Sequence, residues 1–243
     1  MSGVIVDIVI NIIASILYFV LGVVSLYFLR KLRAWSKTRL ISTIYNDKTL
    51  VIALTTRNGP FSQSTPRVSF AEVDAIINLK ALVGNKIHID LLKHPHETTI
   101  LSEKNILSLG GPLANLTAAQ ALESLKHRLP FVFQVEPSRK IVIAERVYAP
   151  VYSKDGDRII QDYAVIIKAE NPFTEIESTS KKIFMMMGLH GYGTRGAVLA
   201  MTDAIISKEI WRKVNTGNFS AVIRIDIDKN QRLSVFLEEV WGT

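Results

Sequence analysis

The sequence predicts an α/β protein in which a single transmembrane helix precedes a domain with a mostly parallel sheet, helices on its faces and inserted antiparallel hairpins. Three observations lead to this prediction. An uncharged apolar run stands near the N-terminus. Beyond it, a short apolar run, a turn rich in Gly, Pro, Ser or Asn and an amphipathic helix follow one another three times. Apolar residues make up 48% of the chain and charged residues 21%, which is enough to bury a core and too apolar for disorder.

The apolar run predicts the membrane anchor, in residues 1–29. From Ile8 to Leu29 the chain carries no charge, and a helix of that length matches the hydrocarbon core of a bilayer, about 30 Å thick. A cleaved signal peptide is the alternative, but no basic segment precedes the run and no small-x-small cleavage site follows it. Basic residues follow directly, so residues 30–48 are expected to be a basic juxtamembrane segment, with the N-terminus outside and residues 49–243 in the cytoplasm.

The predicted anchor has a stripe of polar and small residues at spacings typical of paired helices: Asn11, Ser15, Tyr18, Gly22 and Ser25. We expect homo-oligomers through this stripe; the alternative is that a monomeric anchor tolerates these residues. The net charge of +7 depends largely on the basic segment, which indicates membrane lipid as a partner and no nucleic acid. The absence of cysteine excludes dependence on disulfides.

The elements of the remaining chain follow from local patterns. In the first copy, a strand at 50–55 is followed by a helix from Ser69, where Ser69 and Glu72 form a capping box, and then by a short strand at 86–92. The second copy has a strand at 106–111 and a helix at 117–129, and the third has a strand at 183–188 and a helix at 197–213. The segments between and after these copies predict strands at 131–136, 140–152, 158–170, 219–228 and 233–241, with a hairpin turn at Asp155-Gly156.

Ligands of open α/β sheets bind beyond the carboxyl ends of the strands. The loops expected there are residues 57–67, 110–115, 170–173 and 188–196. If their strands are neighbours, the loops meet in one crevice.

The last of these loops contains Gly191, Gly193 and Gly196 in the spacing G-x-G-x-x-G, after an apolar run and before a helix. A dinucleotide site is disfavoured because the motif stands late in the chain and the next acids follow about thirty residues on, where about twenty is usual. We therefore expect a simpler anion site, formed by backbone amides with Thr194 and Arg195 at a helix N-terminus. The sequence identifies no cofactor.

Two other loops at strand ends contribute residues to the predicted ligand site. Gly110, Gly111 and Asn115 would let the backbone turn sharply and present an amide to a ligand; the alternative is a structural turn in which Asn115 or Thr117 caps the helix. Asn171 at the exit of a strand is a ligand candidate as well, although Pro172 explains a plain strand end.

Two residues are candidates for acid–base chemistry. His190 carries an imidazole, the side chain type best suited to acid–base work near neutral pH, and Glu170 is expected at the ligand end of its strand, with Asp162 at the opposite end. His94 and His96 lie in a proline-containing loop that reads as solvated, so we expect no metal site.

The segments NILSLGGPLAN, AENPF and IFMMMGLHGYGT resemble segments of poorly characterised prokaryotic Rossmann-like modules, and the element GGP-x-x-N is also similar to one in archaeal S-layer proteins. The resemblance implies a Rossmann-like domain and no assigned reaction. We expect a single-pass membrane protein whose domain binds a small phosphate-bearing, nucleotide-like ligand as a sensor or effector. The alternatives are a nucleotide-directed hydrolase or nucleosidase and a membrane-anchored scaffold without a ligand.

Overall fold

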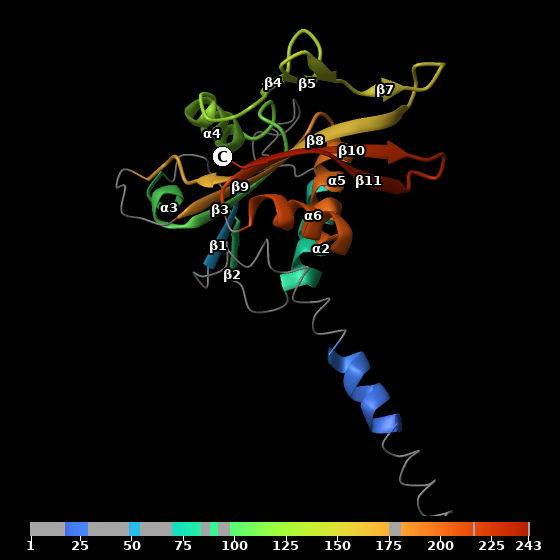
Figure 1. The fold of residues 1–243 in the computed structure, drawn as a ribbon. Helices are drawn as coiled ribbons and strands as arrows, with labels where there is room; N and C mark the ends of the chain where they lie inside the picture. The colour runs from blue at the N-terminus through green and yellow to red at the C-terminus, as the bar shows by residue number, and fades with distance from the viewer. Residues whose placement is uncertain are drawn as a thin grey trace, which may run out of the picture. The chain divides into compact units, whose positions relative to one another are not determined.

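The computed structural model divides the chain into two compact units, Met1–Ser36 and Lys37–Thr243. Figure 1 shows the fold. The structure describes residues 18–28, 49–53, 70–83, 88–91, 98–174, 181–215 and 217–242. The predicted loop at 57–67, the basic segment at 30–48 and the histidines of residues 94–97 lie outside these ranges.

The first unit corrects the prediction of a transmembrane helix. Its described part, residues 18–28, is helical. Among the residues that the structure describes, no helix is both long enough and apolar enough to cross a membrane. The predicted single-pass topology and the localisation that depended on it are therefore wrong.

The polar stripe expected on that helix is described only in part. Tyr18, Gly22 and Ser25 lie on the described helix and are exposed, and a side chain added at Gly22 would contact nothing within 4 Å. Asn11 and Ser15 lie outside the described residues. Homo-oligomers through this stripe stay a prediction.

The second unit is built on one large sheet, shown in Figure 1. Within the described residues this sheet is eight-stranded. Its strands follow in the order β11 (Leu233–Gly242), β10 (Phe219–Ile227), β8 (Ile159–Glu170), β9 (Lys182–Gly188), β3 (Asn105–Leu109), β1 (Thr49–Ala53) and β2 (His88–Leu91), with β7 (Val151–Tyr152) paired to β8. A second, antiparallel sheet consists of β4 (Val132–Gln134), β5 (Lys140–Ile143) and β6 (Arg146–Tyr148); it is called the small sheet below.

The large sheet is mixed, which corrects the predicted mostly parallel sheet. Strands β9, β3, β1 and β2 are parallel, whereas β8 is antiparallel to both β9 and β10, and β11 is antiparallel to β10. A parallel crossover needs a dozen or more residues and usually a helix. Only residues 171–181 separate β8 from β9, too few for such a crossover, so β9 returns alongside β8 in the opposite direction, with Glu170 opposite Lys182.

Helices cover both faces of this sheet. In Figure 1, α2 (Phe70–Val83), α5 (Gly191–Thr202) and α6 (Ala204–Val214) lie on one side, and α4 (Leu116–Leu125) and the small sheet lie on the other. The short helix α3 (Thr98–Glu103), which the sequence pattern did not predict, precedes β3. The predicted helix at 197–213 is two helices, because the side chain of Asp203 accepts hydrogen bonds from the N–H groups of Ile205 and Ile206 and thereby starts α6.

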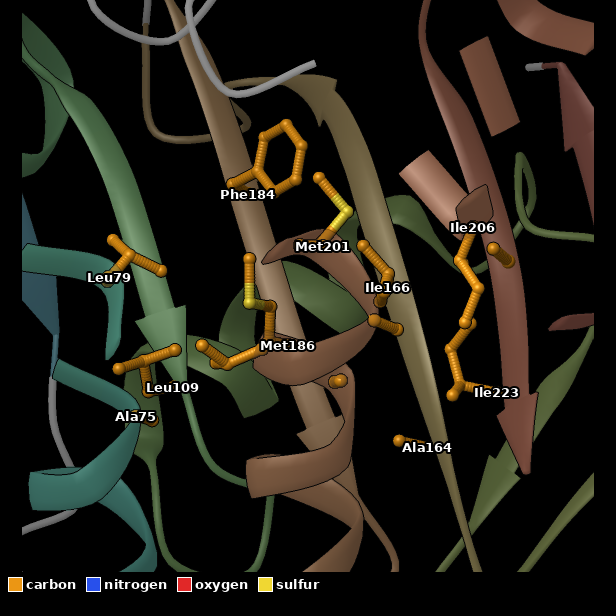
Figure 2. Close-up of a cluster of buried hydrophobic side chains, with 14 of the residues drawn as sticks. Ala75, Leu79, Leu109, Ala164, Ile166, Phe184, Met186, Met201, Ile206 and Ile223 are labelled. Atoms are coloured by element: carbon orange, nitrogen blue, oxygen red, sulfur yellow. The ribbon is translucent and has the colours of Figure 1, made fainter. Parts of the chain in front are cut away.

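Each face has its own hydrophobic core, and β9 contributes to both. Figure 2 shows Phe184 and Met186 of β9 packed in the same core as Ile166 of β8 and Met201 of α5. Met185 and Met187 point to the other core, with α4 and the small sheet. The three methionines are no more than 1% exposed, so β9 is buried on both faces and its successive side chains enter opposite cores.

Candidate functional site

A cleft lies where the parallel strands β3 and β9 end and α5 begins. It has an inner cavity of about 90 Å³ and an adjoining outer hollow of about 540 Å³. The inner cavity is lined by Glu72 of α2, by residues 110–114, by parts of the segment 133–139 and by the β9–α5 loop. The outer hollow extends over Pro137, Pro150 and Tyr152. Both parts share Val135, Arg139 and His190, and together they are called the rim cleft.

The glycines after β9 have a packing role that requires the absence of a side chain. A Cβ atom at Gly193 would lie 2.6 Å from the carbonyl oxygen of Tyr163 and 2.7 Å from the Cα atom of Gly188. A Cβ atom at Gly188 would in turn meet the backbone of Gly193 and Thr194. The first turn of α5 is thereby pressed against β8 and β9, so the G-x-G-x-x-G spacing shapes a close helix–sheet contact.

The loop after β3 meets this turn directly. Gly110 has φ of 96°, a conformation that favours glycine, and its N–H donates to the carbonyl of Met186 at 3.1 Å. A Cβ atom at Gly111 would lie 3.1 Å from the carbonyl oxygen of Gly188. Two of the segments expected in one crevice, 110–115 and 188–196, therefore do meet, because β3 and β9 are parallel neighbours. The second was predicted as a loop, but only Leu189 and His190 lie between β9 and α5, and the glycine motif forms the start of the helix.

The N-terminus of α5 is capped from inside the protein. Asp162 of β8 is fully buried, and its Oδ2 accepts the N–H of Gly193 at 2.6 Å while its Oδ1 accepts the N–H of Tyr163 at 2.9 Å. Because this carboxylate occupies the N–H of Gly193, the first turn of α5 is only partly available to an external anion. The backbone of Gly191 still lines the inner cavity.

His190 is the residue before α5 and bridges the two parts of the rim cleft. Its Nδ1 lies 3.5 Å from Oδ1 of Asp162, and its Nε2 lies 3.4 Å from the hydroxyl of Tyr152. The rings of His190 and Tyr152 meet edge to face. His190 occupies the N-cap position without a side-chain capping bond. Its ring is therefore directed toward Asp162 and the cleft instead of toward the helix backbone.

Arg139 and Glu72 place opposite charges on the cleft wall. Arg139 is partly buried, and its Nη1 donates to the carbonyl oxygen of Leu189 at 2.9 Å, so its guanidinium is held at the boundary of the inner and outer parts. Glu72 is 4% exposed and lines the inner cavity. Thr194, also on the wall, accepts the N–H of Gly188 through its hydroxyl oxygen at 3.2 Å. The cleft thus combines one cation, one carboxylate and one imidazole.

Two predicted ligand residues of the glycine motif face away from the cleft. Arg195 forms an ion pair with Asp74 of α2, at 2.5 Å between Nε and Oδ2. Gly196 packs against Ile225 of β10 on the covered face of the sheet. Both residues attach α5 to its neighbours, because they lie a turn further along the helix than the cleft.

Asn115 is close to the cleft but serves the backbone. It is 2% exposed, and its Nδ2 donates to the carbonyls of Ala53 and Leu109 and to the hydroxyl of Ser108 at 2.8–3.1 Å. Its Oδ1 accepts the N–H of Ala118 and caps α4. These contacts agree with the alternative to a ligand role, a structural turn in which Asn115 caps the following helix.

Glu170 and Asn171 lie at the other end of the large sheet. Because β8 is antiparallel to β9, the carboxyl end of β8 pairs with Lys182 at the start of β9, whereas Ala164 pairs with Gly188 at the cleft. Glu170 forms an ion pair with Lys182, and Asn171 donates to the carbonyls of Leu101 and Lys104. The prediction placed Glu170 at the ligand end of its strand and Asp162 at the opposite end. In the structure the start of β8 lies at the cleft, so Asp162 is the acid near the cleft.

Arg139, Glu72, Tyr152 and Asp162 were not predicted as site residues. For Asp162 the sequence did hold a signal. The Asp155-Gly156 hairpin makes β8 antiparallel to β7, so a parallel orientation of β8 in the sheet, and with it the end of β8 that faces the ligand, could not be assumed. Arg139 comes from a sheet on the opposite face, and no local pattern points to it. Glu72 was noted only for helix capping.

In the described part of the chain, no group of three or more His, Cys, Asp or Glu side chains could hold a metal ion. No protein-family model matches the chain, and a comparison with curated proteins gave no significant match.

Proposed function

We propose that the α/β unit binds a small phosphate-bearing, nucleotide-like ligand in the rim cleft. The observation that carries the proposal is the convergence of the loops after β3 and β9 with Arg139 and the first turn of α5. In open α/β sheets, this position beyond the carboxyl ends of parallel strands is where ligands bind. The site is concave and has a few polar groups on a largely apolar wall, as small-molecule sites do.

The phosphate lies at the junction of the inner cavity and the outer hollow. Arg139 belongs to both, and its planar guanidinium can bind phosphate oxygens with two parallel hydrogen bonds. The exposed Gly191 offers its backbone without a side chain in the way. Arg139 therefore takes the role that the sequence pattern assigned to Arg195.

The remainder of the ligand occupies the walls on either side of this junction. The carboxylate of Glu72 in the inner cavity accepts hydrogen bonds from hydroxyl or amino groups, as acids do from ribose in nucleotide sites. Phe133 and Leu113 of the inner cavity and Tyr152 of the outer hollow offer apolar and aromatic surface to a base. A nucleotide presents these three chemistries in one molecule.

Ligand binding connects the small sheet to the packed pair of helices α2 and α5. Arg139 precedes β5 of the small sheet, Glu72 belongs to α2 and Gly191 starts α5. A ligand held by all three stabilises one arrangement of the small sheet against α2 and α5. This is the physical basis for a sensor or effector role, since a ligand shifts an equilibrium by its differential affinity for two arrangements.

Thermal unfolding of the full chain tests the proposal. We expect AMP and the dinucleoside monophosphate adenylyl-adenosine to raise the melting temperature more than adenosine or inorganic phosphate alone. Arg139→Ala should weaken nucleotide affinity by about tenfold or more, because a charged hydrogen-bond partner of the phosphate is lost.

Two arginine variants are matched controls. Arg195→Ala removes the ion pair with Asp74, and Arg212→Ala removes an exposed charge of α6; both should retain wild-type affinity. Equal affinity in the Arg139 and Arg212 variants would contradict the proposed phosphate position. No thermal shift with any of the four compounds would contradict the ligand-binding function and favour a scaffold.

A further inference from the structure

We propose that the rim cleft hydrolyses a phosphodiester, with His190 as the general base and Asp162 as the residue that positions it. The inference rests on the proposed function, since it requires a phosphate at the junction of the two hollows. It goes further by naming a reaction, a substrate class and the groups that act.

Asp162 has the geometry of an orienting carboxylate. It is fully buried, and two backbone N–H donors, from Tyr163 and Gly193, hold its two oxygens in place and stabilise its negative charge. Its Oδ1 is the atom 3.5 Å from Nδ1 of His190. Hydrogen bonds of this kind are often long in the unliganded protein and shorten when the substrate is bound.

This arrangement defines which nitrogen of His190 can accept a proton. With the hydrogen on Nδ1 directed at Asp162, Nε2 carries the free electron pair. Nε2 faces the hydroxyl of Tyr152 at 3.4 Å, on the side where His190 lines both parts of the cleft. In this tautomer the Tyr152 hydroxyl donates to Nε2, and in the proposed reaction a water molecule at the junction takes the place of that hydroxyl. The side chain of His190 makes no helix-capping bond that would explain its orientation in another way.

The shape and charge of the cleft select a diester over a monoester. A phosphate at the junction has space on both sides, in the inner cavity and in the outer hollow, and a diester has a substituent on each side of its phosphorus. A diester carries a single negative charge. The described wall provides one guanidinium, Arg139, and also one carboxylate, Glu72, which disfavours a dianionic group.

The step conserves atoms and electrons. The water oxygen attacks phosphorus while one water proton passes to Nε2 of His190, and the bond from phosphorus to the leaving oxygen breaks with its electron pair on that oxygen. The leaving oxygen takes a proton from solvent, and the imidazolium, stabilised by Asp162, releases its proton to solvent. The products are an alcohol and a phosphate monoester. Arg139 faces the charge that develops on the non-bridging oxygens.

Hydrolysis of thymidine 5′-monophosphate p-nitrophenyl ester by the full chain tests the inference. We expect the wild type to release p-nitrophenolate from this diester, and at most a small fraction of that rate from the monoester p-nitrophenyl phosphate. His190→Ala and His190→Gln should lower kcat by about a hundredfold or more, because a positioned general base contributes at least that much. Binding of adenylyl-adenosine should stay within about threefold of wild type.

Three controls separate a chemical role from a structural one. Added imidazole should restore part of the rate of His190→Ala, which repair of folding would not explain. Asp162→Asn should lower kcat with little change in KM, because the tautomer of His190 is no longer selected. His127→Ala, at an exposed histidine after α4, should behave as wild type.

The outcomes distinguish the two proposals. If adenylyl-adenosine binds but the wild type hydrolyses no diester, the inference is wrong while the proposed function stands. Unchanged kcat in a folded His190→Gln protein, or no rescue by imidazole in a folded His190→Ala protein, also contradicts it. If none of the compounds binds, the proposed function is wrong as well.

Discussion

Both ends of the large sheet carry polar side chains, but these side chains make different contacts. At the far end, Glu170 and Asn171 bond to Lys182 and to backbone carbonyls, so their hydrogen-bonding capacity is used within the protein. At the cleft end, Arg139 and His190 have close neighbours but still line open space. The difference shows that polar residues at a strand end indicate a site only when the topology leaves them beside a cavity.

The largest expected effect is at the cleft end. Gly193→Ala places a methyl group 2.6 Å from the carbonyl oxygen of Tyr163, in contact with backbone that cannot move without separating α5 from β8. We expect a loss of unfolding free energy of about 3 kcal/mol or more, as for severe overpacking. Chemical denaturation measures it, with Gly156→Ala as a milder control, since an added Cβ there meets nothing within 4 Å and only the φ of 77° is strained. A loss at Gly193 no larger than at Gly156 would contradict the close contact.

Asn115→Ala tests whether a polar residue near the cleft belongs to its structure or to its ligand. The change leaves the carbonyls of Ala53 and Leu109 without this donor and removes the cap of α4. We expect a loss of about 2–4 kcal/mol in unfolding free energy. The affinity for adenylyl-adenosine, measured by calorimetry below the unfolding transition, should remain that of wild type. A large loss of affinity in a folded protein would move Asn115 into the ligand site.

Lys168, two residues before the far end of β8, gives a pH-dependent prediction. It is 2% exposed, and burial together with the charge of Lys182 lowers its pKa to about 8. Below that pH both folded and unfolded states carry the charge, so its burial cost is present in full. Between about 8 and the ordinary value of 10.5, the folded state releases the proton first and stability rises with pH.

Lys168→Met should therefore be more stable than wild type at pH 7, by on the order of 1–3 kcal/mol. The difference should shrink between pH 8 and 10.5. Denaturation curves of both proteins across this range measure it, and a pH-independent difference would show that the charge of Lys168 is not the cause.

The smallest expected effect is at Glu170. Its ion pair with Lys182 is half exposed, and such pairs contribute little to stability. Glu170→Gln should change the unfolding free energy by less than about 0.5 kcal/mol and leave diester hydrolysis unchanged. Loss of hydrolysis in this variant would restore Glu170 as a candidate acid and would overturn the distinction between the two ends of the sheet.

Much of the second unit was predictable because its signals are local. The short apolar runs at β3, β9 and β10, the turn at Asp155-Gly156 and the capping of α4 each depend on residues within one short segment. The direction of β8 was not predictable in this way. An apolar run predicts a strand but not whether the strand is parallel or antiparallel to its neighbours, because that orientation depends on which strands it pairs with.

In the candidate site, too, the features that depend on local sequence were predictable and those that depend on distant segments were not. The loops containing Gly110 and His190 were predicted together because both follow apolar strands and precede helices. Arg195 was a plausible anion ligand by position, but whether a helical side chain faces the cleft or α2 depends on packing. Asp162 and Arg139 are 28 and 51 residues from His190 in the chain, and no sequence spacing connects them.

The sequence by itself determined that the second unit is an α/β structure with buried central strands, and that glycine-rich turns follow β3 and β9. These properties come from side-chain periodicity and backbone freedom, which act over a few residues. The tertiary structure alone decided that β8 runs antiparallel, that its Asp162 caps α5 beside His190, and that Arg139 arrives from the small sheet. Pairing and packing between distant segments are collective, because each strand takes the direction and position that bury the most surface and satisfy the most hydrogen bonds together.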